Sequence, residues 1–135
     1  MHNNKSRIDT YKTIYNVDLV VANKYSSIEE LNKLYKTVND DDITEDFFDS
    51  IATTVNCRNR ETNAYVILVR YNHDSTDKTV DKKIDFINTI SHEAGHVVLD
   101  IYTKIEQQVC TCSSEMFCYL LGWVSECIYK TLTAK

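Results

Sequence analysis

Proline is absent from this chain, and glycine occurs only twice in 135 residues. Turns normally use both residue types, because proline presets φ and glycine accepts a positive φ. Asparagine and aspartate also tolerate turn conformations, so we expect them to form the turns. Internal repeats, low-complexity tracts and linkers are missing too, and the length fits one domain, which we expect to span residues 1–135.

Long apolar runs are also missing. No stretch approaches the roughly 20 residues that a membrane-spanning helix requires. The first residues lead into Ile8-Asp9-Thr10 instead of an apolar signal core. Five cysteines form an odd set, and in a chain without a signal sequence reduced thiols explain them more simply than disulfides. We therefore expect a cytoplasmic protein that makes no contact with a membrane.

Positive charge is in short supply. The 15 lysines and arginines face 20 aspartates and glutamates, which gives a formal net charge of −5. No basic excess is left to neutralise phosphate groups, so we do not expect nucleic acid as a partner. Apolar residues make up 43% of the chain, which is enough to bury a core and excludes wholesale disorder.

The first half of the chain is expected to contain strands and short helices. Segments 13–21 and 64–71 are rich in β-branched and aromatic residues and predict strands. Ser27 lies three residues before a glutamate, which is the spacing of a capping box, and predicts a short helix up to residue 35. Segment 47–52 has an apolar face that favours another short helix or a turn.

The second half of the chain is expected to be helical. Apolar residues recur at steps of three and four from about residue 80 to residue 104, which is typical of an amphipathic helix. The same pattern returns at about 113–130, where Cys118 and Cys127 are expected to be buried as small apolar side chains. Strands followed by two long helices predict an α+β fold.

One motif inside the first of these helices carries chemistry. His92-Glu93-Ala94-Gly95-His96 has the form H-E-x-x-H, and the four-residue step places both imidazoles on one helical face. Two such nitrogens can bind one Zn²⁺ ion, which takes a third protein ligand and a water in catalytic sites. Glu93 lies about 100° around the helix and is suited to remove a proton from that water. The alternative is a helix whose histidines and glutamate are merely solvated or meet polar partners.

The third zinc ligand has to come from another residue type, because no histidine follows His96. Asp100 lies about 12 Å along the helix axis from the first histidine, so we exclude it as a ligand to the same ion. Glu115 is preferred, since the intervening residues allow the next helix to pack back against the first. Glu106, Glu126 and the cysteines remain the alternatives, and of the cysteines Cys110 and Cys112 are expected in the loop near the metal-binding helix.

H-E-x-x-H followed about twenty residues later by a glutamate resembles the gluzincin group of zinc metallopeptidases. The resemblance covers residues 64–130, and the size of the chain is similar to the smallest, single-lobed members. It implies a zincin-like fold in which His92, His96 and Glu115 bind zinc and Glu93 is the general base. It also implies that segment 64–71 is the edge strand that holds an extended peptide by strand addition.

The compact form is similar to small zinc peptidases encoded by bacteriophages and other mobile elements. Peptide hydrolysis also requires a donor to the developing oxyanion. Tyr119 is our first choice, because it lies one turn beyond Glu115 on the same helical face, although a packed aromatic residue is the alternative. Other candidates for the oxyanion donor are Tyr71, His73, Tyr102 and Tyr129.

Two functional hypotheses follow. The first is a zinc-dependent hydrolase that cleaves peptide bonds in a peptide or protein substrate, with a zinc-bound water activated by Glu93. The second is a catalytically inactive zincin-fold binding or structural protein in which zinc staples two helices. Such a protein would act with an assembly partner, for example as a component of a larger phage assembly.

Overall fold

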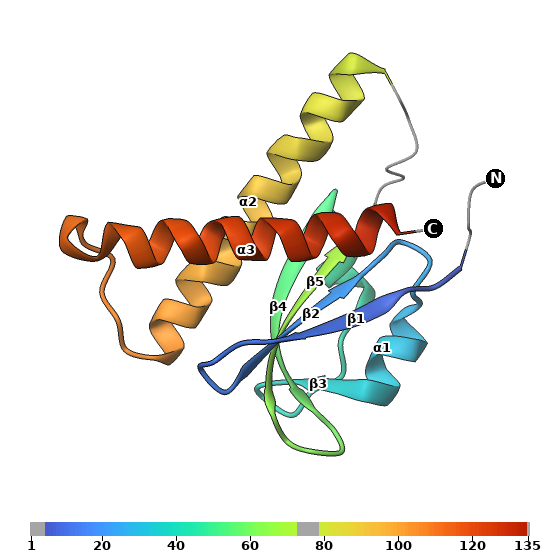
Figure 1. The fold of residues 1–135 in the computed structure, drawn as a ribbon. Helices are drawn as coiled ribbons and strands as arrows, with labels where there is room; N and C mark the ends of the chain where they lie inside the picture. The colour runs from blue at the N-terminus through green and yellow to red at the C-terminus, as the bar shows by residue number, and fades with distance from the viewer. Residues whose placement is uncertain (1–4, 73–78, 135) are drawn as a thin grey trace.

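The computed structural model describes residues 5–72 and 79–134 and has an α+β fold, as the sequence predicts. A five-stranded mixed sheet in the order β1-β2-β5-β4-β3 is combined with three α-helices in these ranges (Figure 1). The elements in chain order are β1 (Ile8–Lys12), β2 (Val17–Ala22), α1 (Ile28–Leu34), β3 (Tyr35–Thr37), the 3₁₀ helix η1 (Glu45–Phe48), β4 (Ala52–Asn59), β5 (Tyr65–Tyr71), α2 (Val80–Lys104), the 3₁₀ helix η2 (Thr111–Ser113) and α3 (Ser114–Thr133).

Strand β5 occupies the middle of the sheet, so the prediction that segment 64–71 is an edge strand was wrong. It pairs in parallel with β2 on one side and antiparallel with β4 on the other. Residues 66–69 are all buried, which means that both faces of the strand are covered. A continuous apolar run of this kind is typical of a central strand, because an edge strand with one solvated side carries polar residues.

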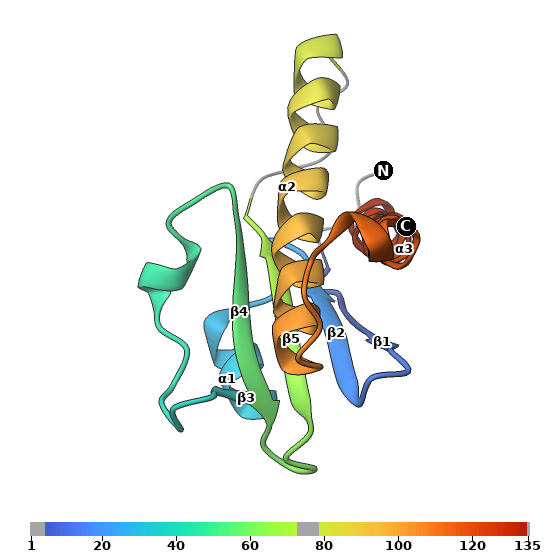
Figure 2. The same cartoon turned by 90° about the vertical axis from the view of Figure 1, so that its left-hand side faces the viewer.

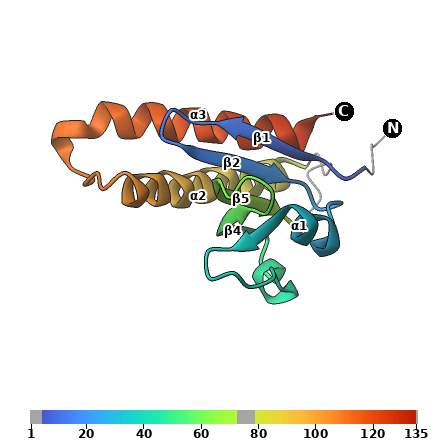
Figure 3. The same cartoon turned by 90° about the horizontal axis from the view of Figure 1, so that it is seen from below.

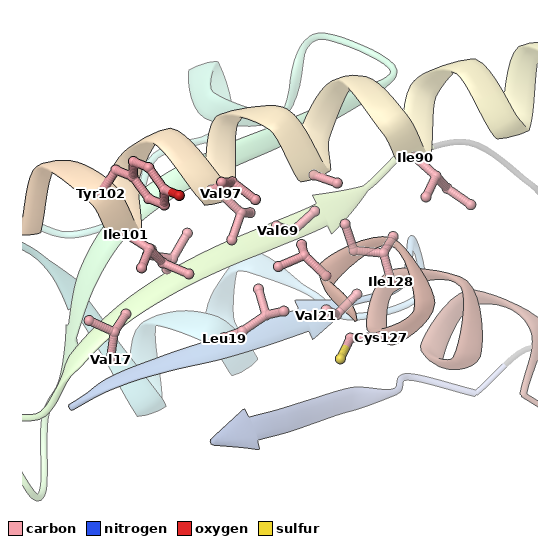
Figure 4. Close-up of a cluster of buried hydrophobic side chains, with 14 residues drawn as sticks. Val17, Leu19, Val21, Val69, Ile90, Val97, Ile101, Tyr102, Cys127 and Ile128 are labelled. Carbon is pink, nitrogen blue, oxygen red and sulfur yellow. The ribbon is translucent and has the colours of Figure 1, made fainter. Parts of the chain in front are cut away.

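The sheet is covered on both faces. Leu19 and Ile67 face α2 and α3, where they pack with residues such as Val97 and Ile128 in one buried cluster (Figure 4). Their neighbours in β2 and β5 point the other way and form a second cluster with Leu31 of α1. This division follows from the alternation of side chains along a strand. In Figure 3 the sheet accordingly lies between α1 and the pair formed by α2 and α3.

The turns use asparagine and aspartate, as the shortage of glycine predicts. Three of the four described residues with a positive φ are Asn16, Asp40 and Asn63, and the fourth is Glu106. Asn16 lies between β1 and β2, within the segment 13–21 that was predicted to be a single strand. That strand begins only at residue 17, and Ile14 in the turn is 89% exposed.

Two predictions about short elements had different outcomes. The capping box is confirmed. The Ser27 side chain accepts a hydrogen bond from the backbone N–H of Glu30, and the Glu30 side chain accepts one from the backbone N–H of Ser27. The prediction for segment 47–52 was wrong in part, since the 3₁₀ helix ends at residue 48 and Ala52 already begins β4. Strand β4 was missed because polar residues fill most of its positions.

The cysteines differ from the expectation of five reduced thiols. Cys110 and Cys112 form a disulfide in the connection between α2 and α3. Their Cα atoms are 5.4 Å apart, which is within the range that a disulfide spans. Cys127 is buried as predicted, whereas Cys118 is exposed. The cysteines therefore give no support to a reducing compartment. None of the helices in the described ranges has the length and apolar character to cross a membrane.

Candidate metal centre

The H-E-x-x-H motif lies in the middle of α2, on the side that faces β4. Residues Val97, Val98 and Ile101 are buried on the core side of the same helix. Figures 2 and 3 show β4 and α3 on opposite sides of α2. The helical period therefore directs His92, Glu93 and His96 toward a polar strand, while Ala94 of the motif faces the core.

The two histidines of the motif converge. The Nε2 atoms of His92 and His96 are 3.1 Å apart, and both residues are exposed. Two nitrogens bound to one tetrahedral Zn²⁺ at 2.0–2.1 Å are separated by about 3.3 Å. The observed separation is that of a hydrogen bond between the two rings, and it is also close to this value, so the two nitrogens are near enough to bind one ion.

Glu93 lies next to the two histidines and is hydrogen-bonded to a residue of β4. The side chain is 7% exposed, and its Oε2 atom accepts a hydrogen bond of 2.5 Å from Oγ1 of Thr54 in β4. This length is typical of a hydroxyl that donates to a carboxylate. Thr54 could not be predicted from the sequence, because its role depends on the packing of β4 against α2.

A cavity of about 440 Å³ opens between β4 and α2. Both histidines and Glu93 line it, and an adjoining hollow of about 350 Å³ shares His92 and Glu93. The cavity can accommodate a small ligand or a short peptide segment. Further lining residues that the sequence analysis did not assign to the site are Ser50, Ala52, Thr53, Thr54, Asn56 and Asp100.

Asp100 lines the same cavity although it was excluded as a ligand. Burial raises the pKa of its carboxyl group, and the charge of His96 and the side chain of Asn56 oppose that rise. The Oδ1 atom of Asn56 is buried and has no hydrogen-bond partner within residues 5–72 and 79–134. The site therefore contains two polar side chains, Asp100 and Asn56, that do not belong to the H-E-x-x-H motif.

Glu115 is not brought together with the histidine pair. It lies exposed in the first turn of α3, and α3 packs on the side of α2 opposite to β4 (Figures 2 and 3). Among the described residues, no three His, Cys, Asp or Glu side chains form a group that could hold a metal ion. Glu115 as the third ligand stays a prediction.

The tyrosines predicted as oxyanion donors lie outside the cavity lining. Tyr119 is 76% exposed on α3. Tyr102 is buried against Phe117, with ring centroids 5.7 Å apart, and its hydroxyl has no partner in the described part of the chain. Tyr71 and Tyr129 contact Phe86 instead, and His73 lies outside the described residues. Tyr119 as the oxyanion donor stays a prediction.

Comparisons with known proteins add no further assignment. No family model, curated protein or solved structure matches the chain. The interpretation of this site therefore depends on its residues and their geometry.

Proposed function

We propose that this protein is a zinc-dependent hydrolase that cleaves peptide bonds, with His92 and His96 as zinc ligands and Glu93 as the general base. The observation that carries the proposal is the 3.1 Å separation of the two Nε2 atoms, which matches a shared tetrahedral ion. Imidazole nitrogens are ligands of the type that zinc prefers, and the adjacent cavity offers room for a substrate. A zincin-like fold is part of the same proposal.

Zinc in such a site polarises a carbonyl group and makes water acidic enough to act as a nucleophile near neutral pH. Glu93 removes the proton from the attacking water and later delivers it to the leaving amine. Its burial and the hydrogen bond from Thr54 support this role, because both hold the carboxyl group beside the histidine pair. The Thr54 hydroxyl occupies one carboxylate oxygen, which leaves the other for the water.

We place the substrate peptide on β4 instead of β5. Strand β3 pairs only with Cys57–Asn59 of β4. On the same outer side, the carbonyl oxygen of Asn56 accepts a hydrogen bond from the N–H of Val38 and that of Ala52 accepts one from the Ser50 hydroxyl. Thr54 between them has no backbone partner on this side within the described residues. A strand with unpaired backbone groups of this kind can bind an extended peptide through backbone hydrogen bonds. This segment lines the cavity that contains Glu93, which would bring the bound peptide close to the base.

Glu115 is proposed as the third ligand, which requires the first turn of α3 to approach the histidine side of α2 when zinc binds. The Glu115 side chain itself is exposed, whereas Phe117 of the same turn packs on Tyr102, so this ring contact would have to change when the turn moves. Glu126 is a matched control on the same helix, because it is exposed and pairs with Lys130 at 2.9 Å. We expect Glu115→Ala to weaken zinc binding at least tenfold and Glu126→Ala to leave it unchanged, measured by competition with a chromogenic chelator.

The proposed activity is tested by hydrolysis of a fluorogenic peptide library by the zinc-loaded parent and by Glu93→Gln. We expect Glu93→Gln to lower kcat by about 100- to 10,000-fold, the usual contribution of a general base. Zinc content should stay the same, because the amide is nearly isosteric with the carboxylate. Cleavage by Glu93→Gln at the parental rate would overturn the role of Glu93.

A second candidate is a binding or structural protein in which the site holds zinc without turnover. The observation that favours it is the cavity lining, which in the described residues includes no tyrosine or arginine to stabilise an oxyanion. In that case the unpaired part of β4 would hold a partner protein instead of a substrate. A zinc-loaded parent that binds library peptides and cleaves none of them would support this candidate.

A further inference from the structure

The interface between β4 and α2 is polar where a helix usually packs on a sheet through apolar residues. Ala52, Thr54 and Asn56 alternate along β4 and lie on the face toward α2, whereas Val55 and Cys57 belong to the core on the other face. Across the interface from Thr54 is Glu93. A polar pair at a buried interface costs stability unless it is hydrogen-bonded, and the bond between Thr54 and Glu93 meets this condition.

The two carboxyl oxygens of Glu93 have different surroundings. Oε2 receives the hydrogen bond from Thr54. Oε1 accepts no bond from any described residue, and it is also not one of the buried atoms that lack a partner. Because the Glu93 side chain lines the cavity, Oε1 is the oxygen that can meet a water molecule there. Thr54 thus holds one oxygen of a carboxyl group whose other oxygen has no partner among the described residues.

The backbone of Thr54 faces a different direction from its side chain. The carbonyl oxygen of Asn56 accepts a hydrogen bond from the N–H of Val38, so the peptide groups of Asn56 point away from β5. Residues two apart in an antiparallel strand orient their peptide groups alike, so the N–H and C=O of Thr54 also point outward. This is the unpaired side of β4 on which we place the substrate peptide.

We infer that Thr54 is the positioning residue of this site: its hydroxyl aligns Glu93 while its backbone pairs with the substrate strand. The inference deepens the proposed function and rests on it. Because one residue makes both contacts, the register of the bound peptide and the orientation of the base are set together. The hydroxyl acts through Glu93 and takes no part in the proton transfer itself.

The first test compares Thr54→Val, which keeps the β-branched shape and removes the donor, with Thr54→Ser, which keeps the donor. We expect Thr54→Val to lower kcat for peptide hydrolysis by about 10- to 100-fold, the usual effect of losing a group that orients a site residue. KM and zinc content should change less than threefold, and Thr54→Ser should restore kcat to within about threefold of the parent. Equal losses of kcat in both variants, or no loss in Thr54→Val, would overturn the positioning role.

The second test needs no activity. In the zinc-free chain, Thr54→Val leaves a buried carboxylate without its donor and should lower the urea midpoint by roughly 0.5 M. In a Glu93→Ala background the same substitution should leave the midpoint unchanged, because the partner is gone. Equal shifts in both backgrounds would overturn the contact itself. A parent that hydrolyses no peptide would overturn the proposed function together with the positioning role, while this cycle still reports whether Thr54 holds Glu93.

Discussion

The two sides of α2 follow different physical rules. The core side carries Ala94, Val97, Val98 and Ile101, which are all buried in one apolar cluster. The side toward β4 carries polar side chains, one of them the buried carboxylate of Glu93. Apolar burial stabilises the fold, whereas a buried carboxylate costs free energy unless it is hydrogen-bonded. The comparison teaches that the core side accounts for stability, whereas the polar side carries the residues to which we assign the proposed function.

The largest effect on stability is expected on the core side. Ile101→Ala should lower the free energy of unfolding by about 2–5 kcal/mol, because it removes a fully buried side chain and leaves a cavity. Leu99→Ala on the same helix is the control, since Leu99 is exposed and its loss should cost less than about 0.5 kcal/mol. Urea unfolding of both variants measures the difference. Similar costs would contradict the assignment of the two sides.

Zinc should stabilise the chain through the other side of α2. At a free zinc concentration of 100 times Kd, the free energy of unfolding should rise by about 2.7 kcal/mol. His96→Ala should show none of this gain, because one of the two converging nitrogens is lost. Thermal unfolding with and without zinc tests the expectation. An equal gain in the parent and in His96→Ala would locate the bound metal elsewhere.

Buried thiols of the core should make stability fall at alkaline pH. Burial raises the pKa of Cys57 to about 12, from an ordinary value of 9.0. Above pH 9 the unfolded chain therefore loses this proton while the folded chain keeps it, so stability decreases as pH rises from about 9 toward 12. We expect Cys57→Ala to show a smaller loss of stability between pH 8 and pH 10.5 than the parent. Cys118→Ala is the control, since Cys118 is exposed.

The smallest change in the free energy of unfolding is expected from a substitution at Gly95 of α2. A Cβ atom added at Gly95 would meet no atom within 4 Å apart from its chain neighbours and the backbone of its own helix, so alanine fits without strain. Gly95→Ala should raise the free energy of unfolding by about 0.5–1 kcal/mol, because glycine weakens a helix interior. Chemical denaturation measures this gain, and zinc content should stay the same. A loss of stability would mean that this part of the motif is more crowded than the structure indicates.

Much of the fold could be predicted because local patterns decide it. The capping residue Ser27, the turn residue Asn16 and the α+β class follow from propensity and spacing alone. The position of β5 in the sheet could not be predicted in this way, because a run of apolar residues does not say which strands pair with it. Strand β4 was not predicted, because side chains that it turns toward α2, such as Thr54 and Asn56, are polar. A strand that packs against a helix usually has apolar residues at such positions.

The candidate site could be predicted only where it is local. His92, Glu93 and His96 lie within five residues, so one helical turn arranges them. Thr54 lies 39 residues away from Glu93 in the sequence, and only the packing of β4 on α2 joins the two. The orientation of α3 is likewise a tertiary property, which is why spacing could suggest Glu115 but could not test it.

The measurement that tests the central claim most directly is the zinc content of the purified chain by elemental analysis. The parent, His92→Ala and His96→Ala would be compared, with His73→Ala as a control histidine outside the motif. We predict one zinc per chain in the parent and in His73→Ala, and a loss of that zinc in both motif variants. A parent that binds no zinc at micromolar metal, or motif variants that keep it, would contradict the account.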